Sequence, residues 1–510
     1  MMFIIHQINF NVFLPIIYKY NHIFLKNMNE EGHGAKLTGY DAFYIIILTF
    51  IALAIRLWVI FHPDGPVFDE VHFGNFTNWY TKSQFFFDIH PPLGKLIMFA
   101  FSNLSEYDGN LPFHNTRKYP DCSYVSLRLT PAIFSALCCP LIYVTVRFSG
   151  FGYISAITAA TLMVTDTSMA TEGRFILSDG MLHFFSCLHL AIISFTFSLR
   201  LQNRKKFAAW HVLTGLSLGA ACSCKNTAWG LMGLDAFIYI VNFFPLTKIG
   251  IMDYLFEIFV YGSTLFLLNL FVYLASFYVH FIVLPLSGQG KGYLPENMKA
   301  QLIPLSAPNV SIMGRRIQKP GLLYRSLKLT WIMHSGNMGI RNFHGSQSRP
   351  HNWPFLTGID VGFWGGYGQE IKCHGNVFSY YFAFLGVVLC AFPYKHELYM
   401  KGIRFTIGWM MCYFPFYLIP RTMYLYHYLI PLMIGCCAYG AILEMILPKK
   451  LRGIVAFATW TLAWFGFWLW MPLVYGKYGH DRNIMYWNDN WLHGDAVYKS
   501  EQALDRQKKR

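Results

Sequence analysis

Two adjacent carboxylates, Asp69 and Glu70, follow the first expected transmembrane segment and are of a type that could do chemistry. A carboxylate within hydrogen-bond reach can take the proton of an attacking hydroxyl group, as a general base does. Basic side chains at the edges of apolar segments could stabilise a phosphate that leaves as an anion. These cations are Arg128, Arg174, Lys225 and Arg421. The combination predicts transfer of a sugar from a phosphate to a hydroxyl, because a glycosidase would need two carboxylates but no cationic cluster.

Further ionisable residues stand at the same ends of the apolar segments. Glu172 and Asp179 surround the start of one segment, and His427 opens another. Charges at membrane depth mark a functional site by default, although a single one can be an interfacial residue whose long side chain reaches water. Because all of them fall at one end of the expected helices and none at the other, we expect one pocket. A transporter would place such charges near the midplane of the membrane. The sequence contains no His-Glu-x-x-His pattern, which disfavours an intramembrane metalloprotease.

The composition is that of a membrane protein with many spans. Of the 510 residues, 55% are hydrophobic and only 13% are charged, whereas soluble domains carry about a quarter charged residues. The formal charge of +15 does not indicate nucleic-acid binding, because the basic residues form short clusters between apolar runs instead of one patch. Apolar windows predict an all-α polytopic protein with about eleven transmembrane helices. They cover residues 42–61, 125–147, 152–169, 175–199, 208–224, 227–245, 256–280, 376–393, 403–420, 422–446 and 453–475.

Basic loops between the expected spans predict the orientation. Clusters at 200–206, 395–401 and 449–452 fall on one side, which the positive-inside rule makes cytoplasmic. The expected organisation is a cytoplasmic segment 1–41, a transmembrane half 42–280 with the lumenal loop 62–124, a lumenal loop 281–375, a transmembrane half 376–475 and a lumenal tail 476–510. Residues 1–27 are either an amphipathic segment or precede the true start. Cys122 and Cys373 lie in polar segments on the same predicted side and could form a disulfide.

Residues 67–95, VFDEVHFGNFTNWYTKSQFFFDIHPPLGK, closely resemble the first lumenal loop of the protein O-mannosyltransferases. Further similarities follow in family order at LRLTP (127–131), RFILSDG (174–180), Lys225, His280–Phe281, Ser287–Gly288, SQSRPHNWP (346–354), Gly375–Asn376 and RTMYLYHY (421–428). The resemblance implies a GT-C fold. It also implies transfer of mannose from dolichyl phosphate mannose to Ser or Thr hydroxyls of proteins in the endoplasmic reticulum lumen, by a single inverting displacement.

The resemblance also implies roles for individual residues. By position, Asp69 resembles the family's catalytic base and Glu70 its essential neighbour, while Arg128 and Lys225 resemble the groups that hold the lipid phosphate. No tightly bound cofactor is implied, since dolichyl phosphate mannose is the donor substrate.

Other matching residues are expected to support the site. For Arg174 and Asp179 we favour an ion pair that positions it. His90 is expected to be a hydrogen-bonded residue of the loop that carries the base, and Arg421 and His427 belong to a later lumenal signature.

Three departures from the family pattern concern the acceptor. Members from fungi and animals usually carry a β-trefoil MIR module in the second lumenal loop, and the loop 281–375 is too short for three trefoil repeats. The family's usual Asp after Ser287–Gly288 is Lys291 here, and the residues around Lys225 are atypical. We therefore expect a form without the MIR domain, whose acceptor selectivity does not follow from the resemblance.

Two other functions remain open. The chain could be another GT-C transferase that extends a lipid-linked oligosaccharide, or an inactive scaffold in a mannosyltransferase dimer, since family members pair with an identical or a different member. Sequons occur at Asn75, Asn103 and Asn309, and Asn75 is expected to be unmodified because it lies in the candidate active loop.

Overall fold

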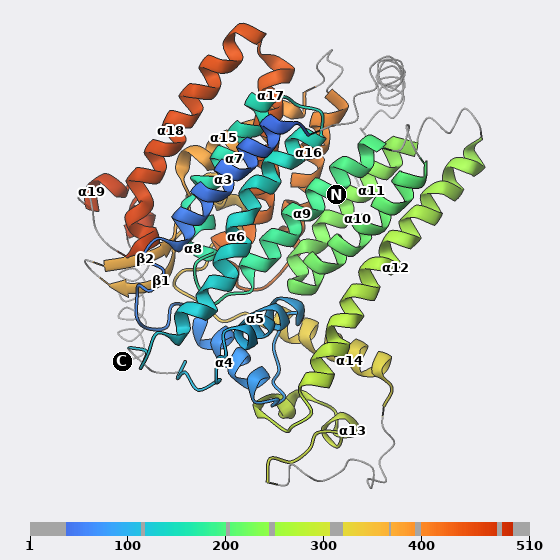
Figure 1. Ribbon diagram of the computed structural model, residues 1–510, viewed down its shortest axis with the longest axis vertical. Coiled ribbons are helices and arrows are strands. Elements are labelled where there is room, and N and C mark those ends of the chain that lie inside the picture. The colour runs from blue at the N-terminus through green and yellow to red at the C-terminus, as the bar shows by residue number, and fades with distance from the viewer. Residues whose placement is uncertain are drawn as a thin grey trace, which may run out of the picture.

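The structure, a computed structural model, describes residues 37–113, 118–199, 204–243, 250–306, 320–366, 369–392, 399–476 and 482–492. The predicted segment 1–27, the sequon at Asn309 and the end of the tail lie outside these residues. Long helices pack side by side into one bundle, and shorter helices and loops gather at one end of it (Figure 1).

Every predicted span contains a helix. Helices long and apolar enough to cross a membrane are α3 (Gly39–Leu57), α6 (Ser123–Phe148), α9 (Asp179–Leu199), α10 (Arg204–Cys224), α12 (Ile251–Val283), α17 (Leu429–Ile446) and α18 (Lys449–Tyr475). The remaining predicted spans hold the shorter helices α7 (Tyr153–Val164), α11 (Gly230–Phe243), α15 (Val377–Cys390) and α16 (Tyr399–Tyr413). A multi-pass helical membrane protein is therefore confirmed, while the number of spans stays a prediction.

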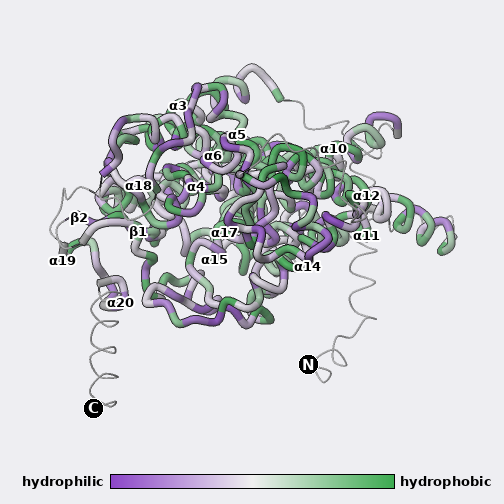
Figure 2. The backbone as a smooth tube through the Cα atoms, turned by 90° about the horizontal axis from the view of Figure 1, so that it is seen from below, coloured by the Kyte–Doolittle hydropathy of each residue, from purple (hydrophilic) through white to green (hydrophobic). Residues whose placement is uncertain are grey.

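The outer faces of the long helices are apolar. Along α12, where hydrophobic residues predominate (Figure 2), Phe256, Phe259 and Phe271 are 67%, 70% and 65% exposed. Such a surface is unfavourable in water but suits a bilayer, whose acyl chains are as apolar as these side chains.

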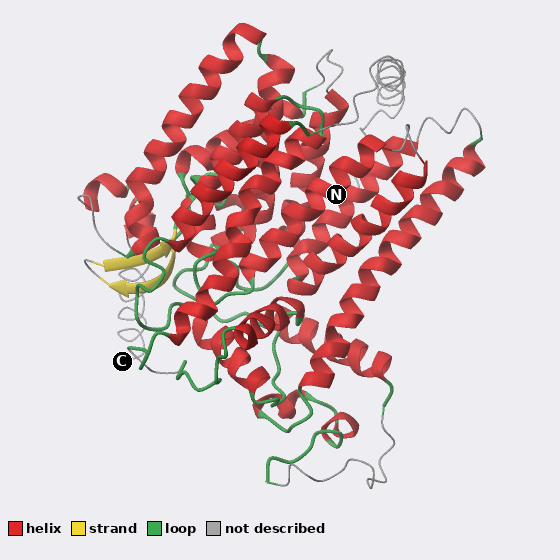
Figure 3. Ribbon diagram, viewed as in Figure 1, coloured by secondary structure: helices red, strands yellow, loops and turns green. Residues whose placement is uncertain are grey.

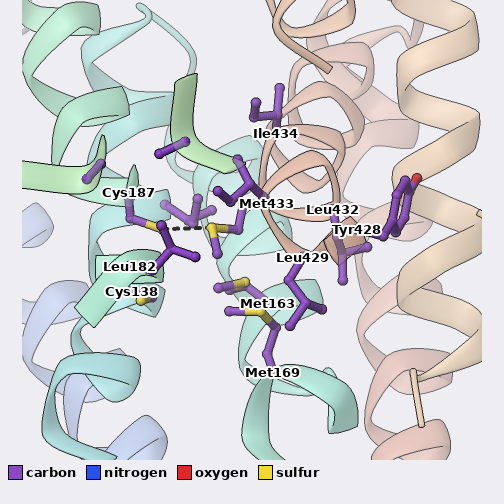
Figure 4. Close-up of a cluster of buried hydrophobic side chains, with 14 of the residues drawn as sticks. Cys138, Met163, Met169, Leu182, Cys187, Tyr428, Leu429, Leu432, Met433 and Ile434 are labelled. Atoms are coloured by element: carbon purple, nitrogen blue, oxygen red, sulfur yellow. Dashed lines mark hydrogen bonds between the residues drawn. The ribbon is translucent and has the colours of Figure 1, made fainter. Parts of the chain in front are cut away.

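Sulfur-containing side chains fill the bundle interior where α6, α9 and α17 meet (Figure 4). The Cys187 thiol lies 3.3 Å from the sulfur of Met433, and Met163 and Met169 pack nearby with no exposure. Methionine is unbranched and adapts to irregular gaps, which suits a junction where helices of different lengths converge.

The helix is interrupted between α7 and the short helix α8 (Thr167–Glu172). Asp166 lies at this interruption, and its carboxylate caps α8. It accepts hydrogen bonds from the backbone N–H groups of Met169 at 2.8 Å and Asn376 at 3.1 Å. The Asn376 side chain in turn donates to the carbonyl oxygen of Ala463 in α18 at 2.8 Å. This network fixes α8 against the start of α15 and the middle of α18, and so fixes Glu172 at its end.

The two long loops pack together at one end of the bundle (Figure 1). They contain α4 (Glu70–Thr81), α5 (Leu93–Leu104), η3 (Gln289–Tyr293), α13 (Glu296–Lys299), α14 (Leu322–Met338) and η5 (Pro350–Asn352). Single β-bridges join Gln84 to Leu286 and Leu286 to Ile303. The first loop is thereby held against the second.

An all-α protein was expected, but the second loop also forms an antiparallel hairpin (Figure 3). Its strands are β1 (Val361–Gly366) and β2 (Gln369–Cys373), with Val361 opposite Cys373. No other strand occurs among the described residues of this loop, so they hold no β-trefoil. The disulfide that the sequence left possible is not formed: Cys122 is exposed, Cys373 is buried in β2, and both are free thiols.

The described part of the tail contains α19 (Arg482–Met485), which packs on α18, and α20 (Asp489–Leu492), which contacts the hairpin. The indole N–H of Trp491 donates to the carbonyl oxygen of Leu356 at 2.7 Å, and the Lys372 ammonium donates to the carbonyl oxygen of Trp491 at 2.9 Å. The tail and the second loop therefore share one end of the bundle.

Candidate functional site

The Glu70 side chain accepts five hydrogen bonds at the loop end of the bundle. Its carboxylate accepts two hydrogen bonds from the Arg128 guanidinium, at 2.7 and 2.8 Å, with both side chains fully buried. It also accepts from the backbone N–H of Val67 at 2.9 Å, the backbone N–H of Ile176 at 3.0 Å and the Tyr119 hydroxyl at 3.3 Å. Glu70 therefore joins the first loop to α6 and to the approach to α9, and is a positioning residue.

Arg128 has no nitrogen left for a substrate. Its remaining hydrogen bonds go to the carbonyl oxygens of Ile60, Pro63 and Gly65, at 3.1, 2.8 and 3.1 Å. The guanidinium is thus enclosed by Glu70 and the chain that follows α3. This geometry argues against the expected phosphate contact, and we assign Arg128 to the support of the loop.

Asp69, next to Glu70, has a different environment. It is the N-cap of α4, yet its side chain makes no capping hydrogen bond. The preceding residue, Phe68, has φ 47°, a left-handed backbone conformation that is rare for a residue with a bulky side chain. Its ring stacks on that of Phe363, with 4.5 Å between the ring centres. The strained turn places two successive carboxylates in different surroundings, one fully bonded and one available.

Burial raises the pKa of Asp69 above its ordinary value, and the nearby charges of His72 and Lys225 partly offset this rise. A carboxylate with a raised pKa is a stronger base when it is ionised. Asp69 therefore combines the availability and the basicity that proton abstraction needs.

Lys225 pairs with Asp179, and the predicted ion pair between Arg174 and Asp179 is wrong. The Lys225 ammonium lies 2.9 Å from the Asp179 carboxylate and 5.0 Å from the centre of the Tyr426 ring. Arg174 instead donates to the carbonyl oxygens of Ile55, Arg56, Trp58 and Val59 at 2.6–3.2 Å. The last carbonyls of a helix lack partners within it, so Arg174 caps the end of α3.

A cavity of about 820 Å³ opens between α11, α12, α14 and α16. Most of its wall is apolar, with Trp229, Gly233, Leu274, Leu327, Trp331 and Met411 among the lining residues. Arg421 and His427 supply a polar end. The cavity therefore suits a ligand with a long apolar part and an anionic head.

Arg421 holds this polar end against α14. Its guanidinium donates to the side-chain oxygen of Asn337 and, at 3.0 Å, to the carbonyl oxygen of Thr422. His427 stacks on the buried Trp353, whose indole donates to the Ser348 hydroxyl at 2.9 Å. Arg421, unlike Arg128, lines a cavity and is better placed to meet an anion.

A second cavity of about 500 Å³ contains Asp69. Its aromatic walls come from both loops and include Phe73, Phe76, Trp79, Phe86, Phe87 and Tyr293. Asp69 thus lies where an acceptor could approach from outside the bundle.

His90 lines this second cavity beside Asp88. Burial, with Lys225 and Lys95 nearby, holds the pKa of His90 well below its usual value, so the ring is neutral. Lys95 pairs with Asp88 and donates to the carbonyl oxygens of His90 and Pro91 at 2.9 and 3.0 Å. Lys95 therefore fixes the backbone at His90 and Pro91, and the role of the His90 side chain in the loop fold stays a prediction.

Buried charges are not confined to this end of the bundle, so that expectation is wrong. Asp41 at the start of α3 pairs with Arg147 at 2.6 Å, and His189 of α9 lies 3.0 Å from Asp235 of α11. His189 also contacts the Ser217 hydroxyl of α10 at 3.1 Å. A sequence does not distinguish an interhelical pair of this kind from a site residue, because both place a charge in an apolar helix.

The sequence model of the family described as "Dolichyl-phosphate-mannose-protein mannosyltransferase" matches residues 46–285. The model of the "C-terminal four TMM region of protein-O-mannosyltransferase" matches residues 322–493. The chain belongs to the protein O-mannosyltransferase family. The two matches leave residues 286–321 between them, in agreement with a protein O-mannosyltransferase that lacks the MIR domain.

Curated relatives of this protein O-mannosyltransferase include fungal and animal proteins. It is 33% identical over 280 residues to dolichyl-phosphate-mannose–protein mannosyltransferase 6 of Candida albicans, which covers 51% of this chain and 34% of that protein. It is 34% identical over 266 residues to dolichyl-phosphate-mannose–protein mannosyltransferase 3 of Saccharomyces cerevisiae. This match covers 50% of this chain and 35% of that protein. The chain therefore spans about a third of the length of these relatives.

Among solved structures, the protein O-mannosyltransferase Pmt1-Pmt2 complex of S. cerevisiae bound to the sugar donor is similar. The TM-score is 0.79 at 17% identity, over 89% of this chain and 93% of that chain. This similarity establishes the GT-C fold.

Proposed function

We propose that the chain transfers mannose from dolichyl phosphate mannose to Ser and Thr hydroxyls of proteins in the endoplasmic reticulum lumen. The observation that carries the proposal is the arrangement of two cavities. An available carboxylate, Asp69, lines one of them, and an arginine, Arg421, stands at the polar end of the other, which is apolar. Lys225 carries a charge that acts on Asp69 and stands directly before Asn226, which lines the apolar cavity.

The reaction needs one displacement. Asp69 takes the proton of the acceptor hydroxyl as its oxygen attacks the anomeric carbon of mannose, and the bond from that carbon to the phosphate oxygen breaks. Dolichyl phosphate leaves as an anion, which Lys225 and Arg421 stabilise, so no general acid is needed. Attack opposite the leaving group inverts the anomeric centre.

Each cavity suits one substrate. The apolar cavity would take the first part of the polyprenyl chain, and its polar end the phosphate. The cavity that contains Asp69 is open and aromatic, which suits an extended polypeptide whose hydroxyl-bearing residue reaches the carboxylate. The wild-type protein would work as a dimer with an identical or a different family member, as the Pmt1-Pmt2 complex does in yeast.

The test is transfer of labelled mannose in microsomes that contain the full chain, from dolichyl phosphate mannose to a Ser/Thr-rich peptide. We expect an alkali-labile mannose on the peptide, made by the wild-type chain but not by the Asp69→Asn variant. Label on lipid-linked oligosaccharide instead would identify a lipid-directed GT-C transferase. Transfer by a dimer that is insensitive to Asp69→Asn would identify an inactive scaffold.

A further inference from the structure

Glu172, the last residue of α8, is a buried carboxyl group that the proposed reaction does not use. It is 1% exposed, and its Oε1 atom has no hydrogen-bond partner. Buried polar atoms are paired in the great majority of cases, because an unpaired one costs about 1–3 kcal/mol. The carboxyl group also interacts with the Cys373 thiol, but its Oε1 atom stays unfilled at this depth and is available to a partner that is not part of the chain.

The surroundings of Glu172 place it among the groups proposed to do the chemistry. Its carboxyl group interacts electrostatically with Asp179, Lys225 and Asp69. Glu172 and Asp69 also both interact electrostatically with the Tyr426 hydroxyl. If Asp69 takes the acceptor proton and Lys225 meets the phosphate, the transferred sugar must lie between these two residues. Glu172 is within electrostatic range of both.

The protonation state of Glu172 suits contact with a sugar. Burial and the Asp179 carboxylate raise the pKa of Glu172 well above its usual range, which favours the neutral acid. A carboxylic acid has one donor and an acceptor oxygen, and can therefore pair with a hydroxyl in either direction.

A purely structural carboxyl in this fold looks different. Glu70 accepts five hydrogen bonds within the chain, and Asp166 is bonded to two backbone N–H groups and the Ser168 hydroxyl. Another buried carboxyl oxygen without a partner among the described residues, in Asp235, belongs to a side chain already paired with His189. Glu172 combines an unfilled oxygen with proximity to Asp69 and Lys225.

We propose that Glu172 binds a hydroxyl group of the sugar carried by the lipid phosphate, and so contributes to the choice of sugar. The inference rests on the proposed function and deepens it. Glu172 would be a specificity residue that leaves proton abstraction to Asp69.

The test is a double-mutant cycle between the protein and the donor. The wild-type chain, Glu172→Ala and Glu172→Gln are each assayed in microsomes with dolichyl phosphate mannose and its 2-, 3-, 4- and 6-deoxy analogues, and kcat/KM is measured for each. In the wild type, removal of the hydroxyl that meets Glu172 should lower kcat/KM by about tenfold or more, because a buried acid is then left unpaired. In Glu172→Ala the same deoxy analogue and the parent donor should react within about twofold of each other.

Glu172→Gln separates recognition from folding. Glutamine keeps a donor and an acceptor in nearly the same space, so discrimination against that deoxy analogue should persist. The inference is overturned if, for every deoxy analogue, the fall in kcat/KM relative to the parent donor is the same in the wild type and in Glu172→Ala. It is also overturned if Glu172→Gln loses the preference for the parent donor while Glu172→Ala keeps it. Absence of transfer by the wild type with the parent donor would instead overturn the proposed function.

Discussion

Glu70 and Arg128 meet in a two-point ion pair, with N–O distances of 2.7 and 2.8 Å and no exposure of either side chain. Asp69, its neighbour, makes no capping hydrogen bond and lines a cavity. Of two adjacent acidic residues, one therefore fixes the loop and the other is available to react.

Loss of the buried pair should destabilise the fold before it affects chemistry. Glu70→Gln would leave the Arg128 charge without its counter-ion in a dry site, at a cost of about 3–5 kcal/mol. This loss of stability is measured by heating the protein in detergent and recording the fraction that stays monodisperse. The double variant Glu70→Gln with Arg128→Met should recover part of the loss, and a double variant less stable than both single variants would contradict this account.

Asp69→Asn should act on chemistry alone. Removal of a general base lowers the rate by roughly 10²–10⁴-fold, while the Asp69 side chain makes no capping hydrogen bond that the fold would lose. The measurement is kcat for mannosyl transfer, with membrane insertion and thermal stability unchanged. An Asp69→Asn protein with full kcat would show that the base is another residue.

The pH dependence of kcat/KM should report Asp69. Protonated Asp69 cannot accept a proton, so activity falls as pH drops through its pKa. Burial raises that pKa, so the acid limb should lie above the ordinary aspartate value of about 3.9. His72 opposes the rise, so His72→Gln should move the limb to higher pH, whereas the exposed His351→Gln should not. A shift to lower pH in His72→Gln would contradict the assignment.

Arg421 rather than Arg128 should control the use of the donor. Arg421→Ala removes a charge-assisted hydrogen bond worth about 1.5–3 kcal/mol, which corresponds to a rise of roughly 10–100-fold in KM for the donor. Arg421→Lys should recover only part of this, since lysine lacks the planar fork. The exposed Arg341→Ala is the matched control. An unchanged KM for the donor in Arg421→Ala would show that the donor phosphate does not bind at this end of the cavity.

The apolar cavity should set the affinity for the lipid chain. Leu274→Trp fills part of its wall, and should raise KM for a long-chain donor more than for a donor with a short, water-soluble prenyl chain. Phe271→Trp, on the exposed face of the same helix, is the control. Equal effects of both substitutions on both donors would place the lipid elsewhere.

Much of the fold could be predicted from the sequence, because hydrophobic length is a local property. Each apolar window contains a helix. Lys225 and Arg421 were selected from their positions at segment ends, and the acidic pair from its place in the first lumenal loop. The hairpin β1–β2 was missed, since its strands of six and five residues are too short to carry a clear periodicity.

Pairing between charges could not be predicted in the same way. The chain order suggested that Arg174 meets Asp179, yet Arg174 caps α3 and Asp179 binds Lys225. Arg128 matched a phosphate-binding position, but its donors are taken up by Glu70 and three carbonyl oxygens. Which cation meets which anion depends on how distant helices pack, and a single sequence does not contain that information. Glu172 could be noticed as a costly charge, but its unfilled oxygen is visible only in three dimensions.

The contact between His189 and Asp235 has a consequence for biosynthesis. An ionisable group in a helix surrounded by lipid is costly, and these two residues lie in helices that are made one after another, with α10 between them. His189 can meet Ser217 as soon as α9 and α10 form a hairpin, and this hairpin then offers Asp235 a polar partner when α11 follows. We expect α9, α10 and α11 to leave the insertion machinery together, because α11 alone would carry an unpaired acid into the hydrocarbon.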